Sequence, residues 1–432
     1  MKLLNTKANR IALLSLTAAI MACAGTVRGD EKELLERIKK LEDRIAELEG
    51  KGPAVAVAKK SPWESWIGAT RFSGYISGSY LYNFNRSKLV NGRTFDINHN
   101  EFDLDKFKLT LEKPVDFSGD KWDVGYRADF IVGEDAKVIQ PLNGPRLGDA
   151  ADFEQVYLTA NIPIGRGLQV SAGRMVTLLG VEVIEEAANP NWSEGNQFIF
   201  VENATSTGVQ FAYKWTDKID TEVRVNNGWD TVKDNNNALS YMGRIGWNPT
   251  DKASLAVVGY GGPEQGAVNG LPPNDGAWRK GVDLVASYKL LTNFAISVQG
   301  DYGTEDPSPQ LASITGNRRL LTEEAEWYAG GIWLVYDFTE KIGVALRGDY
   351  LHDADGARTS GSPTFAPFPA NSGMDLWSLT GTLNLRPLKN LQVRPEVRWD
   401  HSDLGVGAFG DRNHTTGRKN QVTSLLGVAY LF

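Results

Sequence analysis

From residue 72 onward, apolar side chains recur at every second position of the chain. The segment 122–132, WDVGYRADFIV, is the clearest case, because Trp122, Val124 and Tyr126 alternate with Asp123 and Arg127. Successive side chains of a β-strand point to opposite faces, so this period predicts strands with one apolar and one polar face. The same alternation recurs at 219–226 and 391–399. Charges at successive positions of one face would meet bulk water in a sandwich, or an aqueous lumen in a barrel.

About sixteen segments carry this pattern, an even number in the range of outer-membrane barrels, and most are close to the 9–11 residues that cross a bilayer at a tilt. Within 100–113 the apolar residues Phe102 and Leu104 are out of phase with Phe107 and Leu109, which predicts a β-bulge. The predicted strands lie near 72–84, 100–113, 122–132, 152–162, 167–178, 206–215, 219–228, 240–248, 253–262, 281–290, 293–303, 326–338, 341–351, 375–385, 390–400 and 420–432.

The connections between these segments alternate in length. Short connections such as TDK, NPTDK and RPLKN alternate with long ones near 85–99, 133–151, 179–205, 229–239, 263–280, 304–325, 352–374 and 401–419. Short periplasmic turns and long outer loops are typical of a transmembrane barrel, whereas a sandwich has no reason to place every long loop at one end. The pattern therefore predicts an all-β fold, an antiparallel transmembrane β-barrel of about 16 strands spanning 72–432.

The chain ends in the apolar strand LLGVAYLF. Val428, Tyr430 and Phe432 lie on one face, up to the terminal carboxylate. In a closed barrel the last strand pairs with the first, so every backbone polar group in lipid is satisfied. Tyr430 and Phe432 also resemble the C-terminal signal that barrel-assembly machinery reads. We expect this machinery, the outer-membrane lipids and lipopolysaccharide to be the partners of the barrel.

Bulk composition excludes two classes of protein. The chain is 41% hydrophobic and 23% charged, and no run after the N-terminus approaches the roughly 18 apolar residues of a membrane helix. A helical membrane protein is therefore excluded, while a barrel, whose strands alternate, is not. The formal net charge of −7 gives no basic surface for nucleic acid.

The first 24 residues predict a secretory signal peptide. Lys2, Lys7 and Arg10 form a basic start, 11–22 is a short apolar stretch, and 22–24 is an A-x-A cleavage site. Export would bring the mature chain to the outer membrane of a Gram-negative-type envelope. The alternative is that Cys23, the only cysteine, is the acylated first residue of a lipoprotein.

A short coiled-coil helix is predicted over 25–51, followed by a linker over 52–71. Its apolar seam has spacings of 4, 3, 4 and 3, the a and d positions of a coiled coil, and Gly50 and Pro53 end the helix. Ile at a and Leu at d favour a dimer by the coiled-coil rule. The alternative is a lone amphipathic helix on the periplasmic rim. The seam residues, proposed for oligomerisation, are Leu34, Ile38, Leu41, Ile45 and Leu48.

Several segments of the chain resemble a known family. They are GRMVTLLGVEVIEEAANPNWS, NNGWDTVKDNNN, VVGYGGPEQ, LRGDYLHDADGAR and LQVRPEVRWDHSD. Together they resemble the OmpL-like putative beta-barrel porin family over most of 72–432. The resemblance implies a bacterial outer-membrane porin that passes small hydrophilic solutes by diffusion. The coiled coil lies outside the match and resembles the N-terminal segments of some trimeric porins, so we expect a homotrimer.

The third long loop, 179–205, is the candidate constriction of the pore, because the third loop of porins often folds into the lumen. We expect its acids to face arginines on the barrel wall and to set a transverse field across the opening. The alternative is a solvated outer loop, with the wall charges paired among themselves. The candidate residues are Glu182, Glu185, Glu186 and Glu194 on the loop and Arg127, Arg174, Arg224, Arg244, Arg347, Arg394 and Arg398 on the wall.

Other functions have less support in the sequence. All four histidines fall in predicted outer loops, so we expect no enzyme of the outer-membrane phospholipase type, no catalytic residues, no cofactor and no metal site. About 70 residues precede the barrel, too few for the plug of a TonB-dependent transporter. A different class remains open, an envelope-tethering or adhesin-type structural barrel whose lumen is plugged.

Overall fold

A computed structural model describes Lys39 and residues 68–432, except 118, 142, 145–146, 361–367, 369, 372 and 415. The predicted signal peptide, Cys23, the coiled-coil seam Leu34, Ile38, Leu41, Ile45 and Leu48, and most of the linker lie outside the described residues. None of the helices in the described part of the chain has the length and apolar character needed to span a membrane.

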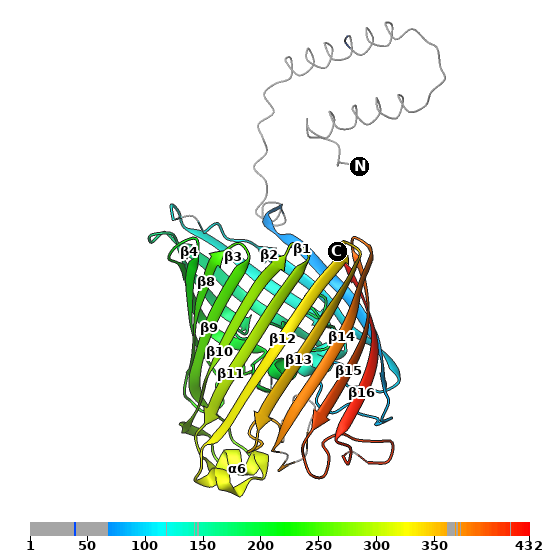
Figure 1. Cartoon of the computed structure of the whole chain (residues 1–432). Helices are drawn as coiled ribbons and strands as arrows, with labels where there is room; N and C mark the ends of the chain where they lie inside the picture. Colours follow the sequence, from blue (N-terminus) through cyan, green and yellow to red (C-terminus); the bar gives the residue numbers. More distant parts are fainter. Residues whose placement is uncertain are drawn as a thin grey trace, which may run out of the picture. The chain divides into compact units, whose positions relative to one another are not determined.

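The described residues form one closed antiparallel barrel of 16 strands, in which each strand pairs with its neighbours in the sequence (Figure 1). This is the fold class predicted from the period of two. The strands are β1 (Arg71–Asn83), β2 (Glu101–Lys113), β3 (Asp123–Val132), β4 (Ala151–Ile162), β5 (Leu168–Val176), β6 (Thr205–Lys214), β7 (Ile219–Asn226), β8 (Ser240–Thr250), β9 (Ala253–Gln265), β10 (Asn274–Leu291), β11 (Phe294–Glu305), β12 (Ala325–Thr339), β13 (Ile342–Asp353), β14 (Met374–Leu388), β15 (Leu391–Ser402) and β16 (Asn420–Leu431).

The barrel closes between β1 and β16. Tyr75 pairs with Leu431 in an antiparallel register, and the backbones of Gly74 and Phe432 exchange two hydrogen bonds of 2.9 Å. A side chain at position 74 would meet the ring of Phe432 at 2.9 Å, so the glycine makes room for the terminal aromatic. Phe432 also stacks on Phe107 of β2, with ring centroids 6.2 Å apart. The last residue is thus held by the seam and does not fray.

The predicted bulge in 100–113 is confirmed. Ser77 pairs with Lys106, whereas Ser79 pairs with Asp103, so one residue of β1 faces two of β2. The extra residue changes the phase of the side chains. Phe102 and Leu104 therefore remain outward although their parity differs from that of Phe107.

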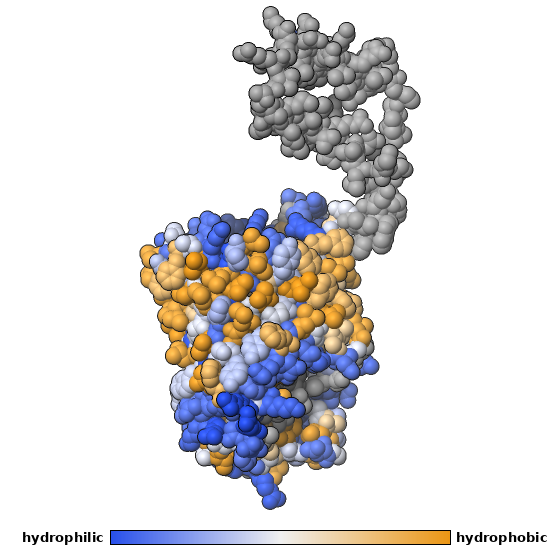
Figure 2. All heavy atoms as spheres, turned by 90° about the vertical axis from the view of Figure 1, so that its right-hand side faces the viewer, coloured by the Kyte–Doolittle hydropathy of each residue, from blue (hydrophilic) through white to orange (hydrophobic). Residues whose placement is uncertain are grey.

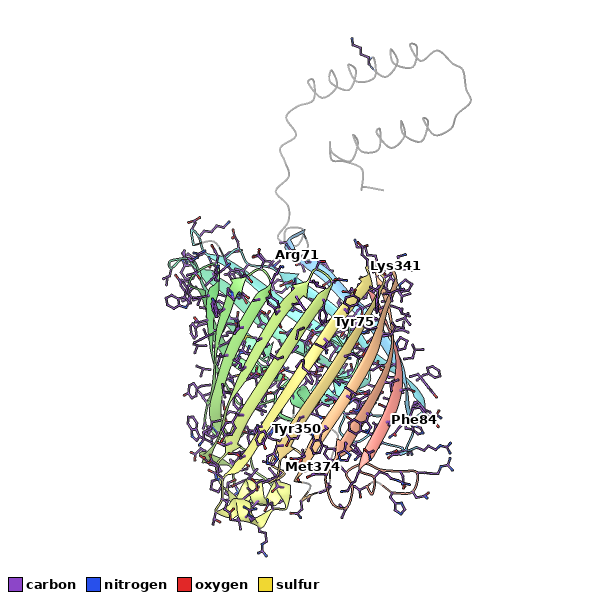
Figure 3. The ribbon with its side chains drawn as sticks, viewed as in Figure 1. Arg71, Tyr75, Phe84, Lys341, Tyr350 and Met374 are labelled. Atoms are coloured by element: carbon purple, nitrogen blue, oxygen red, sulfur yellow. The ribbon has the colours of Figure 1, made fainter. Side chains whose placement is uncertain are left out.

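The strand ends confirm the alternation of short and long connections. Arg71 and Lys341 lie toward the end of the barrel with the short turns, and Phe84 and Met374 toward the end with the long loops (Figure 3). One predicted loop is wrong in extent. The segment 263–280 is largely strand, because β9 continues to Gln265 and β10 begins at Asn274.

Within the described residues, the long loops contain four helices that the sequence pattern did not predict. They are α4 (Glu134–Ile139), α5 (Asn196–Phe200), α6 (Pro309–Thr315) and the 3-10 helix η1 (Arg318–Leu321). The two ends of α6 nevertheless carry recognisable capping residues in the sequence. The Ser308 hydroxyl accepts a hydrogen bond from the backbone of Leu311, Pro309 begins the helix, and Gly316 ends it in the left-handed conformation.

The outer surface of the barrel is apolar and its interior is charged. On the face seen in Figure 2, apolar residues form a band over the half of the barrel nearer the short turns. Leu346, Leu379 and Val397 point outward and are exposed, whereas their neighbours Arg347, Thr380 and Arg398 are buried. This is the inverse of a soluble protein, and it suits a barrel surrounded by lipid and filled by polar side chains.

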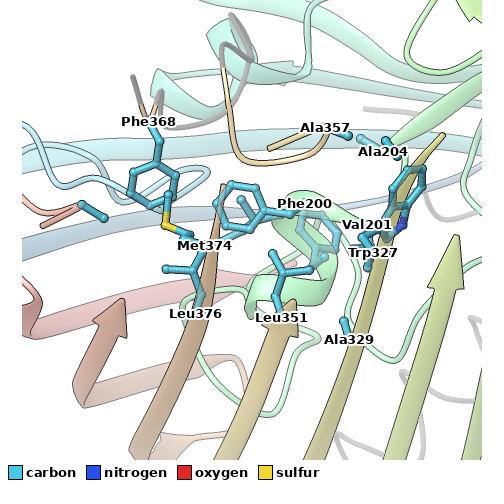
Figure 4. Packing of buried hydrophobic residues seen from close by; sticks show 14 of the residues in the cluster. Phe200, Val201, Ala204, Trp327, Ala329, Leu351, Ala357, Phe368, Met374 and Leu376 are labelled. Carbon is cyan, nitrogen blue, oxygen red and sulfur yellow. The ribbon is translucent and has the colours of Figure 1, made fainter. Parts of the chain in front are cut away.

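A separate apolar cluster lies inside the barrel. Phe200 and Val201, in and just after α5, pack against Trp327, Leu351 and Met374 of the wall (Figure 4). Phe368 and Phe409, from the loops after β13 and β15, cover the same cluster, and Phe200 stacks on Phe368 at 5.8 Å. Apolar burial therefore holds one side of the loop between β5 and β6.

Candidate functional site: the third long loop and the lumen wall

The loop between β5 and β6, residues 177–204, is here named the third loop. It forms hydrogen bonds with inward-facing side chains of β1, β2 and β10–β15. Every residue from Asn191 to Ala204 is buried. The predicted acids and arginines can therefore be placed by the contacts they make.

Glu182 is the one predicted acid that pairs with a predicted arginine. Its carboxylate accepts hydrogen bonds from Arg347 at 2.6 Å, from the indole of Trp333 at 3.0 Å and from the backbone of Gly195 at 2.6 Å. Both side chains are fully or almost fully buried. Arg347 also binds Asp349 at 3.0 Å, so one guanidinium is shared by two carboxylates. These contacts are shielded from solvent and fix the loop to β12 and β13.

Glu185 and Glu186 pair with lysines of β2, which the sequence analysis did not select. Lys106 binds the Glu186 carboxylate at 3.0 Å and the backbone carbonyl of Ile184 at 2.9 Å. Lys108 binds Glu185 and also Glu154 at 2.6 Å. The sequence does indicate that these lysines face the lumen, because both alternate with the apolar residues of β2 and so lie on its polar face.

Two predicted arginines bind the backbone of the loop rather than its acids. Arg394 donates to the carbonyls of Glu186 at 2.6 Å, Asn189 at 2.8 Å and Pro190 at 2.6 Å. Arg398 donates to the carbonyl of Glu194. A loop without regular structure leaves its carbonyls unpaired, and the five donors of a guanidinium can satisfy several at once.

Wall carboxylates serve the amide groups of the loop in the same way. Glu396 accepts from the backbone of Trp192 at 2.7 Å, and Asp349 from that of Asn196 at 3.1 Å. Asp283 accepts from the backbone of Gly180 at 2.9 Å. The wall therefore acts as the hydrogen-bonding partner that secondary structure would otherwise supply.

The other four predicted arginines make no hydrogen bond or ion pair with a carboxylate of 177–204 among the described residues. Arg127 binds Asp129 at 3.0 Å, and Arg174 binds Asp152 at 2.7 Å. Arg224 binds Gln210 at 2.9 Å and the carbonyl of Val176 at 2.7 Å. Arg244 lies between Asp220 and Glu222. Three of these four arginines thus pair with carboxylates of the wall, whereas Arg224 binds an amide oxygen and a backbone carbonyl.

Inward-facing glycines make room for the loop. A side chain at Gly427 of β16 would overlap the indole of Trp192, and one at Gly331 of β12 would overlap Gln197 and Trp333. Trp192 is 3% exposed and packs against Leu81, Val90 and Leu425. The loop therefore fits the wall by shape as well as by charge.

Few side chains of the loop remain accessible. Val183 is 41% exposed, and Ala188 is also exposed. Glu185 is the most accessible of the four predicted acids, with 19% of its side chain exposed. Glu182, Glu186 and Glu194 are 2–3% exposed. The accessible side of the loop thus presents small apolar residues and one acid.

An open cavity of about 770 Å³ lies at the short-turn end of β5–β7, and the short connections after β2 and β4 contribute to its lining. Its lining is largely polar and includes Gln169, Gln210, Lys214, Asp220 and Glu222. The third loop contacts β1, β2 and β10–β16, and its Leu179 packs on Met242 of β8 and Val258 of β9, so the sector of β5–β7 is the less occupied one among the described residues. It offers charged and amide groups to a hydrated solute.

Burial disfavours the charged form of two acids in the loops. Burial raises the pKa of the Glu194 carboxyl well above its ordinary value, and the nearby Asp96 and Glu182 raise the pKa further. Burial also raises the pKa of Asp135 in α4 to about 7, although Lys106 opposes the change. These acids therefore lie where a positive group would be favourable.

Two histidines do not lie where the sequence analysis placed them. His352 belongs to β13 and His401 to β15, and both lie on the outward face. His352 stacks on Tyr328 at 4.6 Å and His401 on Trp399 at 5.8 Å, so both extend a belt of aromatic side chains. The predicted loops 352–374 and 401–419 therefore begin two residues too early.

Comparison with protein families settles the class of the molecule. Residues 69–432 match the family described as "Putative beta-barrel porin-2, OmpL-like". The chain belongs to this family. It is therefore an outer-membrane β-barrel porin, as its resemblance to the family implied. No curated protein sequence matches the chain.

Solved structures of bacterial porins share the fold. The anion-selective porin from Comamonas acidovorans is 9% identical, with a TM-score of 0.56 over 84% of this chain and 99% of that one. OmpT of Vibrio cholerae is 10% identical, with a TM-score of 0.51 over 84% and 97%. OprB of Pseudomonas putida is 13% identical, with a TM-score of 0.51 over 86% and 96%. At these identities the likeness concerns the fold alone.

Proposed function

We propose that this porin passes small hydrophilic solutes by passive diffusion through a lumen narrowed by the third loop. The observation that carries the proposal is the pairing of this loop with the inner wall, above all the buried ion pair of Glu182 with Arg347 at 2.6 Å. A loop held by buried charges and wall hydrogen bonds keeps one cross-section, which a diffusion channel needs.

The passage would run along the wall of β3–β7, away from the strands on which the third loop packs. Glu185 and Val183 would form its edge on the loop side, and Arg127, with 30% of its side chain exposed, would face it from β3. Both signs of charge are present, so the wall orients polar solutes without selecting one substrate. The transverse field expected from the sequence would then rest on Glu185 and Arg127, because the other three acids are buried.

Conductance in a planar lipid bilayer tests this function. We expect the purified full-length protein to give stepwise current increments in salt solution, and liposomes that contain it to swell in small sugars. A persistently silent bilayer, with protein shown to be folded by its heat-modifiable migration, would contradict a diffusion channel. That result would favour a structural barrel with a plugged lumen.

A further inference from the structure

A small cavity lies where the first three long loops meet β2. Its lining includes five carboxyl groups: Asp96 of the loop after β1, Asp105 of β2, Asp135 of α4, and Glu186 and Glu194 of the third loop. All five residues are more than nine-tenths buried. The cavity measures about 10 Å³, which is room for one water-sized body.

Four of these carboxyl groups have an oxygen without a hydrogen-bond partner among the described residues. They are Asp105 Oδ2, Asp135 Oδ1, Glu186 Oε1 and Glu194 Oε1. The second oxygen is paired in three of them, with Ser79 at 3.0 Å for Asp105 and with Lys106 for Asp135 and Glu186. Burying unpaired carboxylate oxygens is costly, so four residues that each carry one and that line the same cavity indicate a positive ligand.

The charges of the protein do not balance at this cavity. Lys106 contacts Asp135 and Glu186, and Arg93 contacts Asp96 at 3.2 Å. Arg93 is shared with Asp400, at 3.1 Å, so it does not compensate Asp96 alone. Five carboxyl groups thus meet two cationic side chains.

A neighbouring cluster shows what a compensated arrangement looks like. Asp129, Glu154 and Glu185 bring three carboxylate oxygens within 4.8 Å of one another. The ammonium of Lys108 lies among them and pairs with all three, and Arg127 pairs with Asp129, so three carboxylates meet two cationic side chains. The protein supplies its own cation there, so that cluster needs no metal ion.

We propose that the cavity lined by Asp105, Asp135, Glu186 and Glu194 binds one Ca²⁺ ion. Calcium takes six to eight oxygen ligands at about 2.3–2.6 Å in flexible geometry, whereas Mg²⁺ dehydrates reluctantly and keeps several waters, for which a one-water cavity has no room. No three of these described carboxylates have oxygens within 4.8 Å of one another. Binding would therefore draw the free oxygens of Asp105 and Glu194 inward by rotation of their side chains.

The ion would join four segments of the chain at one point. Its ligands come from β2, from α4 and from both ends of the stretch 186–194, with Asp96 of the first loop beside them. Calcium would thus fix the inner loops to the wall and to one another. This inference does not depend on conduction, because ion binding and permeation are measured separately.

Terbium luminescence tests the site directly, because Trp192 lines the same cavity. Tb³⁺ replaces Ca²⁺ at oxygen sites, and an adjacent indole sensitises its emission. We expect saturable emission from the detergent-solubilised full chain upon tryptophan excitation, competed away by Ca²⁺ and only weakly by Mg²⁺. Absence of saturable, calcium-competed emission would overturn the proposal and indicate that the buried acids are simply protonated.

Variants locate the ion. Asp105→Asn and Glu194→Gln should each weaken Tb³⁺ binding about tenfold or more, since affinity follows the number of charged ligands. Glu154→Gln, a buried acid of the lysine-filled cluster, should leave binding unchanged. Trp192→Phe should lose the sensitised emission but keep calcium binding measured by equilibrium dialysis. Unchanged affinity in folded Asp105→Asn and Glu194→Gln would overturn the proposal, and if either variant fails to fold, the Trp192→Phe result decides.

Discussion

At the scale of single residues, burial decides which acids of the third loop can act on a solute. The sequence pattern placed all of the candidate arginines on the polar face of their strands, because alternation is a local property. It did not show that Glu182 and Glu186 turn toward the wall, since that depends on partners more than 70 positions away, such as Arg347 and Lys106. Only Glu185 retains an accessible carboxylate.

Neutralising Glu185 should change ion selectivity more than neutralising Glu182. An accessible charge at a narrow passage acts on the permeating ion, because the low-dielectric wall focuses its field. We expect Glu185→Gln to shift the reversal potential under a salt gradient toward anions. Glu182→Gln is the matched control, because both carboxylates pair with a cationic side chain but the side chain of Glu182 is only 1% exposed, against 19% for Glu185. Equal shifts from the two variants would place the passage elsewhere.

Filling the space at Gly427 should displace the third loop. The side chain of Gly427→Val would overlap the indole of Trp192, a residue buried between β16 and the loop. Overpacking of this kind costs about 1–3 kcal/mol, so we expect a folded barrel with a disordered loop, noisier current and faster proteolysis within 177–204. Gly300→Val, where a side chain would meet no atom within 4 Å, is the control and should resemble the wild type.

At the scale of elements, the strands could be predicted because each one carries its own period of two, and the bulge of β2 could be predicted because it breaks that period. The helices of the loops lack such a signal. α5 has five buried residues, Asn196–Phe200, so no polar face marks it as a helix. Its position depends on Trp327 and Leu351, which are distant in the sequence. The pairing of the third loop with the wall is hidden for the same reason.

The last strand and its terminal aromatic should control assembly. Phe432 stacks on Phe107 and closes the seam with Gly74, and its outward ring would lie in lipid. Phe432→Asp places a charge at the end of the lipid face, at a cost of about 1 kcal/mol or less, and removes the terminal aromatic side chain. We expect it to leave most of the protein in the periplasm, measured by fractionation and heat-modifiable migration, while Phe432→Tyr assembles normally. Wild-type outer-membrane levels of Phe432→Asp would refute this account.

At the scale of the whole molecule, two kinds of contact fill the barrel from within. Apolar packing of Phe198–Phe200 holds the third loop on the side of β12–β14, and ionic contacts hold it on β2 and β13–β15. The sector of β5–β7 keeps an open cavity with polar walls. From this asymmetric filling we expect one off-centre passage rather than a central one.

The oligomeric state is the prediction that belongs to this scale. Porins of similar strand number are often trimers, whereas the seam of Ile38 and Ile45 with Leu34 favours a dimer by the coiled-coil rule. The outer wall of a 16-stranded barrel offers far more contact area than a helix of three heptads, so we expect the wall to set a homotrimer. Native mass spectrometry should then show trimers both for the full chain and after deletion of 25–51. A stable dimer of the full chain that becomes monomeric upon this deletion would contradict this prediction. The helices, and not the barrel wall, would then determine the oligomeric state.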